Sequence, residues 1–256
     1  MIAWTESQDS ATLVDIAAVT DDILTPSGTD RFFVPNDYRN IYWGAALGTA
    51  ISRAKYKAPS LETRQQDVEI LPRSVGADAF SLDQPQIFLP QRPIPLASTD
   101  SLGFQAAEDG AGADQLYGVA VLGPDQPDFA PNGDILTARG TGTTTLTANA
   151  WSTVTITLET DLEPGRYALV GAICISATAI VARAIITGQN YRPGFIGLAG
   201  TEATAADYDP AIYSIMQGLS YGEFTHVDVP QFQFLAAAAD TAQTVLMKCI
   251  RIGDFF

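Results

Sequence analysis

The run from Tyr167 to Thr187, YALVGAICISATAIVARAIIT, constrains the fold of this chain more than any other stretch. Sixteen uncharged residues separate Arg166 from Arg183, and a membrane helix needs roughly 20 apolar residues. Leu and Met are nearly absent from the run, whereas β-branched residues are frequent. We therefore predict two strands, buried on both faces and joined by a turn near Ser176–Thr178, in the middle of a sheet sandwich.

The composition is that of one large β domain or of two small ones. Of the 256 residues, 46% are hydrophobic and 17% are charged, so the chain can bury a substantial core. The abundance of Thr, Gly, Pro and Ala favours short strands and turns over helices. The formal net charge is −15 and Lys and Arg do not cluster, so we expect no direct contact with nucleic acid phosphates.

The two cysteines and the N-terminus bear on the cellular compartment. Cys174 and Cys249 lie in apolar, strand-like runs, and we interpret both as buried free thiols, with a disulfide as the alternative. The N-terminal sequence MIAWTESQDS has neither the basic region nor the apolar segment of a signal peptide. We therefore expect synthesis and folding in the cytoplasm.

Short strands are predicted along the whole chain. In the first half they lie at 12–19, 31–34, 41–57 (two strands that bend near residue 48), 86–89, 104–107 and 116–122. In the second half they lie at 135–138, 143–147, 152–159, 195–198, 232–239 and 244–252, besides the central pair. Two short helices are predicted at 60–71, where Ser60 is the expected cap, and at 209–219, which begins with Asp209-Pro210.

The Pro/Gly-rich segment GPDQPDFAPNG, at 123–133, divides the chain into two halves. The second half matches the first at a nearly constant offset, which is the pattern of an internal repeat. The matches are Thr49-Ala50-Ile51 with Thr178-Ala179-Ile180 at 129, Arg53-Ala54 with Arg183-Ala184 at 130, Asp100 with Asp228 at 128, Phe104-Gln105 with Phe232-Gln233 at 128, and Leu122-Gly123 with Ile252-Gly253 at 130. Chance similarity between strand-forming sequences is the alternative.

These features predict an all-β fold of two tandem eight-stranded jelly rolls with one or two short helices. The predicted domains are a first jelly roll at 1–123, a linker at 124–133 and a second jelly roll at 134–256. Each half has the size of one eight-stranded sandwich.

Motifs for catalysis are absent from the sequence. The single histidine, His226, alternates with its neighbours like a strand residue, and no Gly-x-Ser-x-Gly elbow accompanies it. The glycine-rich ARGTGTTT lacks the Gly-Lys-Ser/Thr ending of a phosphate-binding loop. We therefore predict a protein that is no enzyme, with no catalytic, cofactor-binding or metal-binding residues.

One metal site remains as an alternative. Asp125, Asp128 and Asp134 lie in the Pro/Gly segment, and carboxylate and carbonyl oxygens are calcium ligands. Their spacing does not match an EF-hand, and a solvated linker is the simpler interpretation.

The chain resembles the double jelly-roll major capsid proteins of tailless icosahedral viruses, the group that includes adenovirus and several membrane-containing bacteriophages. The two sandwich-sized halves, the linker and the helix at 209–219 carry the resemblance. The phrase AISRAKYKAPSLETRQQDVEILP, in which an Arg-bearing strand precedes Pro-Ser-Leu and an Ile-Leu-Pro segment, is also similar to phage virion proteins of this type. At 256 residues the chain lies near the small end of the family, without room for large towers.

The resemblance implies a structural protein of the virion. It implies a homotrimer whose six rolls form a pseudo-hexagonal capsomer, which then joins a capsid lattice with penton or minor capsid proteins. It further implies assembly in the host cytoplasm, no direct contact with the genome, and only indirect contact with any inner membrane.

Two rival functions share the composition. A carbohydrate- or receptor-binding β-sandwich of a phage fibre or spike would expose a cluster of aromatic residues, for which Trp43, Trp151 and Tyr191 are the candidates. A glycoside-active β-sandwich would bring two carboxylates together across a cleft.

Overall fold

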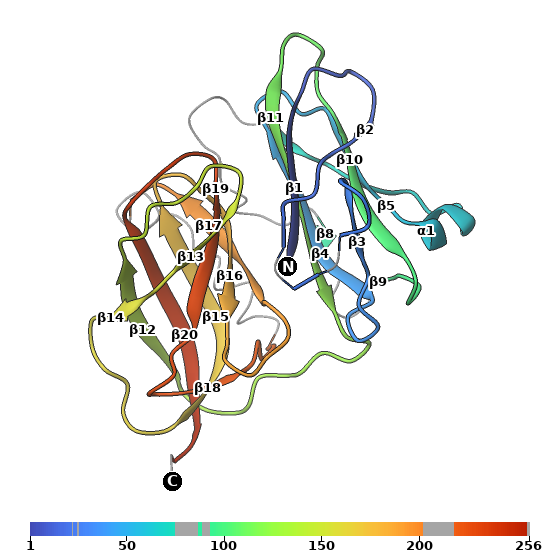
Figure 1. The fold of residues 1–256 in the computed structure, drawn as a ribbon. Helices are drawn as coiled ribbons and strands as arrows, with labels where there is room; N and C mark the ends of the chain where they lie inside the picture. The colour runs from blue at the N-terminus through green and yellow to red at the C-terminus, as the bar shows by residue number, and fades with distance from the viewer. Residues whose placement is uncertain (22, 25, 75–86, 89–92, 202–217, 255–256) are drawn as a thin grey trace. The chain divides into compact units, whose positions relative to one another are not determined.

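The computed structural model describes residues 1–21, 23–24, 26–74, 87–88, 93–201 and 218–254. The chain forms two compact units, Met1–Gln126 and Pro127–Phe256, here called the first and the second unit. The boundary between the units falls inside the Pro/Gly segment of the sequence. Both units are built of strands, as Figure 1 shows.

The first unit contains two sheets. One has the strand order β1-β11-β4-β7, with β8 and β9 also paired with β4; these strands are β1 (Ile2–Gln8), β11 (Asp114–Gly123), β4 (Asn40–Gly48), β7 (Arg73–Ser74), β8 (Ile87–Phe88) and β9 (Ile94–Pro95). The other has the order β2-β10-β5-β6, with β3 also paired with β10; these are β2 (Val14–Asp15), β10 (Ser101–Ala107), β5 (Arg53–Lys57), β6 (Val68–Ile70) and β3 (Arg31–Phe33).

The strands of the second unit form one continuous sheet that folds back on itself. Its order is β13-β19-β16-β17-β15-β20-β12-β14, with β18 also paired with β15. The strands are β13 (Trp151–Val154), β19 (Gln231–Ala236), β16 (Ala179–Ile185), β17 (Gly194–Ala199), β15 (Arg166–Ser176), β20 (Gln243–Gly253), β12 (Ile135–Gly142), β14 (Thr157–Leu158) and β18 (Glu223–Thr225).

Both units have the strand order of a jelly roll. If β3, β7 and β8 are left out of the first unit and β14 out of the second, and the remaining strands of each unit are numbered one to eight along the chain, one set of strands has the order 1-8-3-6 and the other 2-7-4-5. In the first unit these are β1-β11-β4 with β9, and β2-β10-β5-β6; in the second they are β12-β20-β15-β18 and β13-β19-β16-β17. The predicted fold class, two all-β jelly rolls, is confirmed.

The register of the strands repeats as well. Phe104 lies opposite Tyr56 in the first unit, and Phe232 lies opposite Ala184 in the second, so both partners are displaced by 128 residues. At the next position Gln105 faces Lys55 and Gln233 faces Arg183. The match of Phe104-Gln105 with Phe232-Gln233 therefore holds in three dimensions. The match of Arg53 with Arg183 is wrong by two residues, because Lys55 occupies the equivalent position.

In each unit the second strand passes from one sheet to the other. In the first unit β2 pairs with β10, and the residues after it bond to β1 through Thr5 N–H to Ala17 O and Val19 N–H to Ala3 O, both 2.9 Å. In the second unit β13 pairs with β19, and β14, two residues later, pairs with β12. The segment that crosses between the two layers of strands therefore covers one side of each sandwich.

The fifth strand covers the opposite side in the same way. β6 pairs antiparallel with β5, and β7 follows it and pairs parallel with β4. In the second unit β17 alone pairs antiparallel with β16 and parallel with β15. Gly197 lies where β17 changes partner, and a Cβ there would come within 2.8 Å of the Ile180 carbonyl carbon and the Val181 nitrogen. A residue without a side chain permits this close approach.

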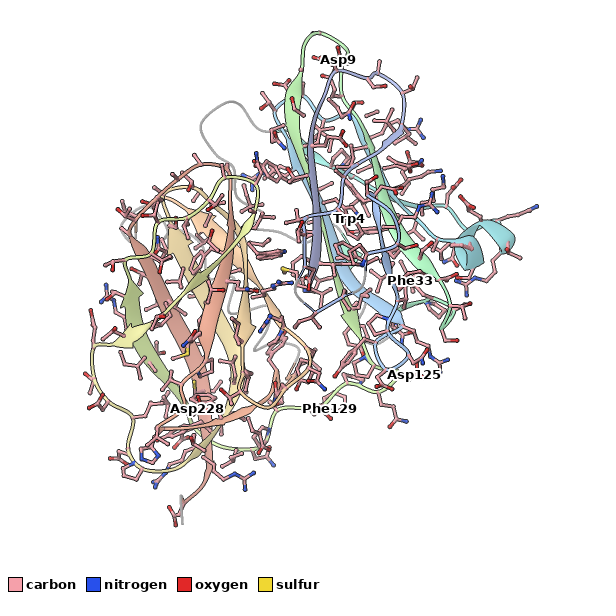
Figure 2. The ribbon with its side chains drawn as sticks, in the orientation of Figure 1. Trp4, Asp9, Phe33, Asp125, Phe129 and Asp228 are labelled. Carbon is pink, nitrogen blue, oxygen red and sulfur yellow. The ribbon has the colours of Figure 1, made fainter. Side chains whose placement is uncertain are left out.

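Each unit encloses its own apolar core. In the first, Trp4 is fully buried and packs on Phe32, Tyr56 and Phe104 with ring centroids 5.7–6.1 Å apart, and Figure 2 shows Trp4 inside the unit. In the second, Tyr167 stacks on Phe224 at 5.7 Å, and Phe195 lies 6.1 Å from Phe232. Such pairs add to the free energy of burial.

The central prediction is confirmed, and several local predictions are not. β15 and β16 occupy the run at 167–187 and turn at residues 177–178, and β4 and β5 repeat the arrangement in the first unit. The helix predicted at 60–71 is only α1 (Pro59–Thr63), because residues 68–70 pair with β5 as β6. The strand predicted at 143–147 is a loop, and the prediction did not include β1. The helix predicted at 209–219 lies outside the described residues, except for its last two positions.

Candidate functional site

The single histidine and the two cysteines considered in the sequence analysis occupy structural positions. His226 is half-buried in the turn after β18, where its Nδ1 accepts a hydrogen bond from Gly165 N–H at 3.3 Å. Cys174 and Cys249 are buried free thiols in the core of the second unit, opposite Val245 and Leu169 respectively. Burial raises the pKa of Cys249 to about 12 and also raises that of Cys174. Both thiols are therefore protonated at neutral pH and pack as small apolar groups.

The three aspartates considered for calcium do not lie within one unit. Asp125 belongs to the first unit, whereas Asp128 and Asp134 belong to the second and are exposed. Within the described ranges, no group of three or more His, Cys, Asp or Glu residues could hold a metal ion.

The three aromatic residues considered for carbohydrate binding differ in setting. Trp43 is buried in β4 of the first unit, with 8% of its surface exposed. Trp151 is half-buried in the second unit, and the Arg183 guanidinium lies 4.1 Å from the centre of its ring. Tyr191, also in the second unit, is half-buried.

The first unit binds the start of the Pro/Gly segment to β4. The Arg39 guanidinium donates to Asp125 Oδ2 at 2.8 Å, and the Asn40 amide donates to Asp125 Oδ1 at 2.9 Å. The Tyr42 hydroxyl donates to the Pro124 carbonyl at 2.5 Å. The hydrogen bonds from Arg39 and Asn40 hold the pKa of Asp125 below its ordinary value. These contacts link residues 124 and 125 to the start of β4.

The second unit binds the continuation of the same segment. Ser220 N–H donates to the Asp128 carbonyl at 2.8 Å, Ala130 N–H donates to the Gly218 carbonyl at 2.5 Å, and Phe129 bridges to Leu219. Only Gln126 and Pro127 therefore lie between the two anchored pieces. Gln126 and Pro127 lie within the predicted linker of 124–133, and Figure 2 labels Asp125 of the first unit and Phe129 of the second.

A hydroxyl and a carboxylate meet at equivalent places in the two units. In the first, Ser60 N–H donates to Asp100 Oδ1 at 3.0 Å and its hydroxyl bonds to Oδ2, so Asp100 supports the start of α1. In the second, the Thr187 hydroxyl donates to Asp228 Oδ1 at 3.0 Å. Ser60 is therefore not the cap, which is Ala58. The match of Asp100 with Asp228 in the sequence was the available signal for this pair.

Asp240 joins the loops at one end of the second unit. Its Oδ2 accepts hydrogen bonds from the Ser176 hydroxyl at 2.6 Å and Ala177 N–H at 2.9 Å, and its Oδ1 accepts from Thr241 N–H at 2.8 Å. Partial burial raises the pKa of Asp240, but these hydrogen bonds outweigh burial and lower it overall. Sequence analysis did not single out Asp240, because its partners meet only in the fold.

Single apolar side chains are exposed on both units. The most exposed are Leu71 at 82%, Phe129 at 71%, Val227 at 69% and Phe33 at 49%, and Figure 2 labels Phe33 and Phe129. Such isolated residues are common on protein surfaces and define no binding site by themselves. No helix among the described residues is long and apolar enough to cross a membrane.

The fold defines an all-β protein of two tandem jelly rolls. No family model matches the sequence, and a comparison with curated proteins found no match. A comparison of structures found the crystal structure of the major capsid protein P2 from Bacteriophage PM2, which is 10% identical, with 94% of this chain and 97% of that chain covered and a TM-score of 0.23. The fold assignment rests on the strand orders and registers of the two units.

Proposed function

We propose that this chain is a structural protein of a virus particle: the major capsid subunit, which forms trimers and then an icosahedral shell. One observation carries the proposal, namely two jelly rolls of the same strand order and matching register in a single chain. Three such chains around a threefold axis bring six rolls of one kind together, so a trimer acquires a nearly hexagonal outline. Subunits of that outline can fill the six-coordinated positions of a closed shell.

The tandem repeat is what favours a shell subunit over a binding module. Jelly rolls occur in capsids, lectins and cupins, so a single roll would name no function. A lectin needs one exposed site and gains nothing from a second roll. A hexagonal lattice built from trimers needs the second roll, because three chains must supply six similar rolls. The settings of Trp43 and Trp151 also give no support to a fibre or spike that binds carbohydrate.

The proposed partners follow from this role. The chain binds its own copies in the trimer and the lattice, and other virion proteins, such as penton or minor capsid proteins, at special positions of the shell. The net charge of −15 suits a layer that does not contact the genome, and an inner membrane would be contacted only indirectly. The protein then resides in the virion and assembles in the host cytoplasm, without enzymatic activity.

Sedimentation equilibrium of the purified chain tests the proposal. At micromolar concentration we expect a species of three times the chain mass, and electron microscopy of that species should show pseudo-hexagonal particles. A chain that stays monomeric at this concentration overturns the proposal. Glycan-array binding by such a monomer would instead establish the fibre or spike function.

A further inference from the structure

The segment from residue 135 to residue 158 contains no acidic residue, although the chain carries 29 Asp and Glu. Its single charged residue is Arg139, which forms an ion pair with Glu159. The segment includes β12, β13 and β14, so the acid-free sequence builds one side of the second unit. Figure 1 shows β14, β12 and β20 at this side.

Threonines cover the outer surface of these strands. Thr141 of β12 lies directly opposite Thr157 of β14 on one side and Thr244 of β20 on the other, so the three share one face of the sheet. Thr137, four residues before Thr141, lies on the same face. We call this surface the threonine face; its members are Thr137, Thr141, Thr157 and Thr244, and the first three of them are exposed.

Two glycines under the threonine face hold its strands close together. A Cβ at Gly140 would come within 3.1 Å of the Thr157 carbonyl oxygen, and one at Gly142 would come within 3.4 Å of the Thr155 carbonyl oxygen. The surface is thus formed by short side chains on closely packed strands. Threonine is β-branched and stiff about χ1, so its burial in an interface costs little side-chain entropy.

The charge of the threonine face differs from that of the rest of the chain. Two cations lie beside it: Arg139, which is paired with Glu159, and Lys248, whose ammonium donates to Thr137 Oγ1 at 3.0 Å. The threonine face therefore has a small positive balance on a chain whose net charge is −15. Copies of an acidic chain repel each other over most of their surface, and the centres of protein interfaces are depleted of charged residues.

Sheet faces are also the surfaces that these units leave available. In the second unit β13 and β14 are the end strands, and β14 pairs with β12 only at Gly140 and Thr141, so short sheet edges accompany the faces.

We propose that the threonine face is a contact surface for a second copy of this chain. The inference rests on the proposed capsid function and names one of the surfaces that the assembly uses. The small positive balance and short side chains of the threonine face let the acidic surface of a neighbouring copy approach it closely.

The test adds two negative charges at the centre of the threonine face. In the full chain, Thr141→Glu combined with Thr157→Glu should raise the dissociation constant of the oligomer about a hundredfold in sedimentation velocity experiments, because like charges then oppose each other. The control, Thr12→Glu with Thr20→Glu, adds the same charge at exposed positions of the first unit and should assemble like the natural chain. Thr141→Ser with Thr157→Ser, which adds no charge, should also assemble.

The outcomes separate this inference from the proposed function. If the Thr141→Glu, Thr157→Glu chain is folded by circular dichroism and assembles like the natural chain, the threonine face is not the contact and the capsid function stands. If both glutamate variants lose assembly equally, the effect is one of net charge and the inference is overturned. If the natural chain itself is monomeric, or binds a polysaccharide through this face, both proposals are overturned. If the double glutamate variant is misfolded, Thr141→Glu and Thr157→Glu are made singly, and a folded single variant that assembles like the natural chain overturns the inference, whereas one that loses assembly supports it.

Discussion

The Tyr56 side chain occupies the space that a side chain at position 44 would need. The Tyr56 hydroxyl donates to the Val119 carbonyl across the core of the first unit, and a Cβ at Gly44 would overlap the hydroxyl and come within 2.6 Å of Tyr56 Cζ. The hydrogen bond therefore depends on a glycine in the strand opposite. Both residues lie in the strand pair that repeats the central pair of the second unit.

This relationship predicts a coupled pair of substitutions. Gly44→Ala should lower the free energy of unfolding by about 2 kcal/mol, because it overpacks a closed core. Tyr56→Phe should lower it by roughly 1–3 kcal/mol through loss of the buried hydrogen bond. In the double variant the missing hydroxyl relieves the overlap, so the loss should fall short of the sum by ~1 kcal/mol. Urea unfolding measures all three; strict additivity would contradict the relationship.

Gly197, where β17 changes partner, should tolerate no side chain. Gly197→Ala places a methyl group against the backbone of Ile180 and Val181, and backbone cannot move aside as a flexible side chain can. We expect a loss of about 3 kcal/mol, measured by thermal unfolding. Gly112→Ala is the matched control, since a Cβ there has nothing within 4 Å; an equal loss in the control would refute the explanation.

Asp240 should make the second unit sensitive to acid. Its pKa in the folded chain lies below the ordinary 3.8, so it binds a proton more readily when unfolded. Its contribution to stability is therefore complete above pH 4 and is lost as the pH falls through the lower, folded-state pKa. Asp240→Asn should cost about 1–3 kcal/mol at neutral pH and should flatten the decline of stability below pH 4. Urea unfolding at a series of pH values checks this, and an unchanged pH profile would count against it.

The contact between Arg39 and Asp125 should protect the linker rather than stabilise the fold. Both side chains are exposed, so Arg39→Gln should change the free energy of unfolding by less than about 1 kcal/mol. It should, however, speed limited proteolysis near Gln126, because residues 124 and 125 lose an anchor. Arg53→Gln breaks a comparable exposed pair with Glu69 on β5 and β6 and should leave the linker cleavage unchanged. Equal cleavage rates in all three chains would contradict the role of the contact.

Hydrophobic pattern was sufficient to predict the strands that are buried on both faces. The run at 167–187 has no competing pattern, since a helix of that composition would lack helix formers and a membrane span would need more residues. β1 was missed because Thr5, Glu6 and Ser7 hide the alternation of Ile2 and Trp4 into the core. The passage of the second strand between sheets was also missed, because pattern within a strand carries no information about which neighbour it pairs with.

The candidate site was harder to predict than the fold. Offsets of 128 residues marked equivalent positions correctly for Phe104 and Phe232, whereas the match of Arg53 with Arg183 at 130 does not hold, because Arg183 is equivalent to Lys55. The Asp125 contact and the Asp240 network join residues more than 60 positions apart. The threonine face likewise arises only when β12 is placed between β14 and β20, which the sequence does not state.

The anchored linker leaves the chain with very few torsion angles between its two rolls. The ring of Pro127 fixes its own φ, and it restricts Gln126 to extended conformations. A single residue inserted after Gln126 would therefore lengthen this short junction while leaving the contacts of Asp125 in the first unit and of Asp128 in the second unit in place.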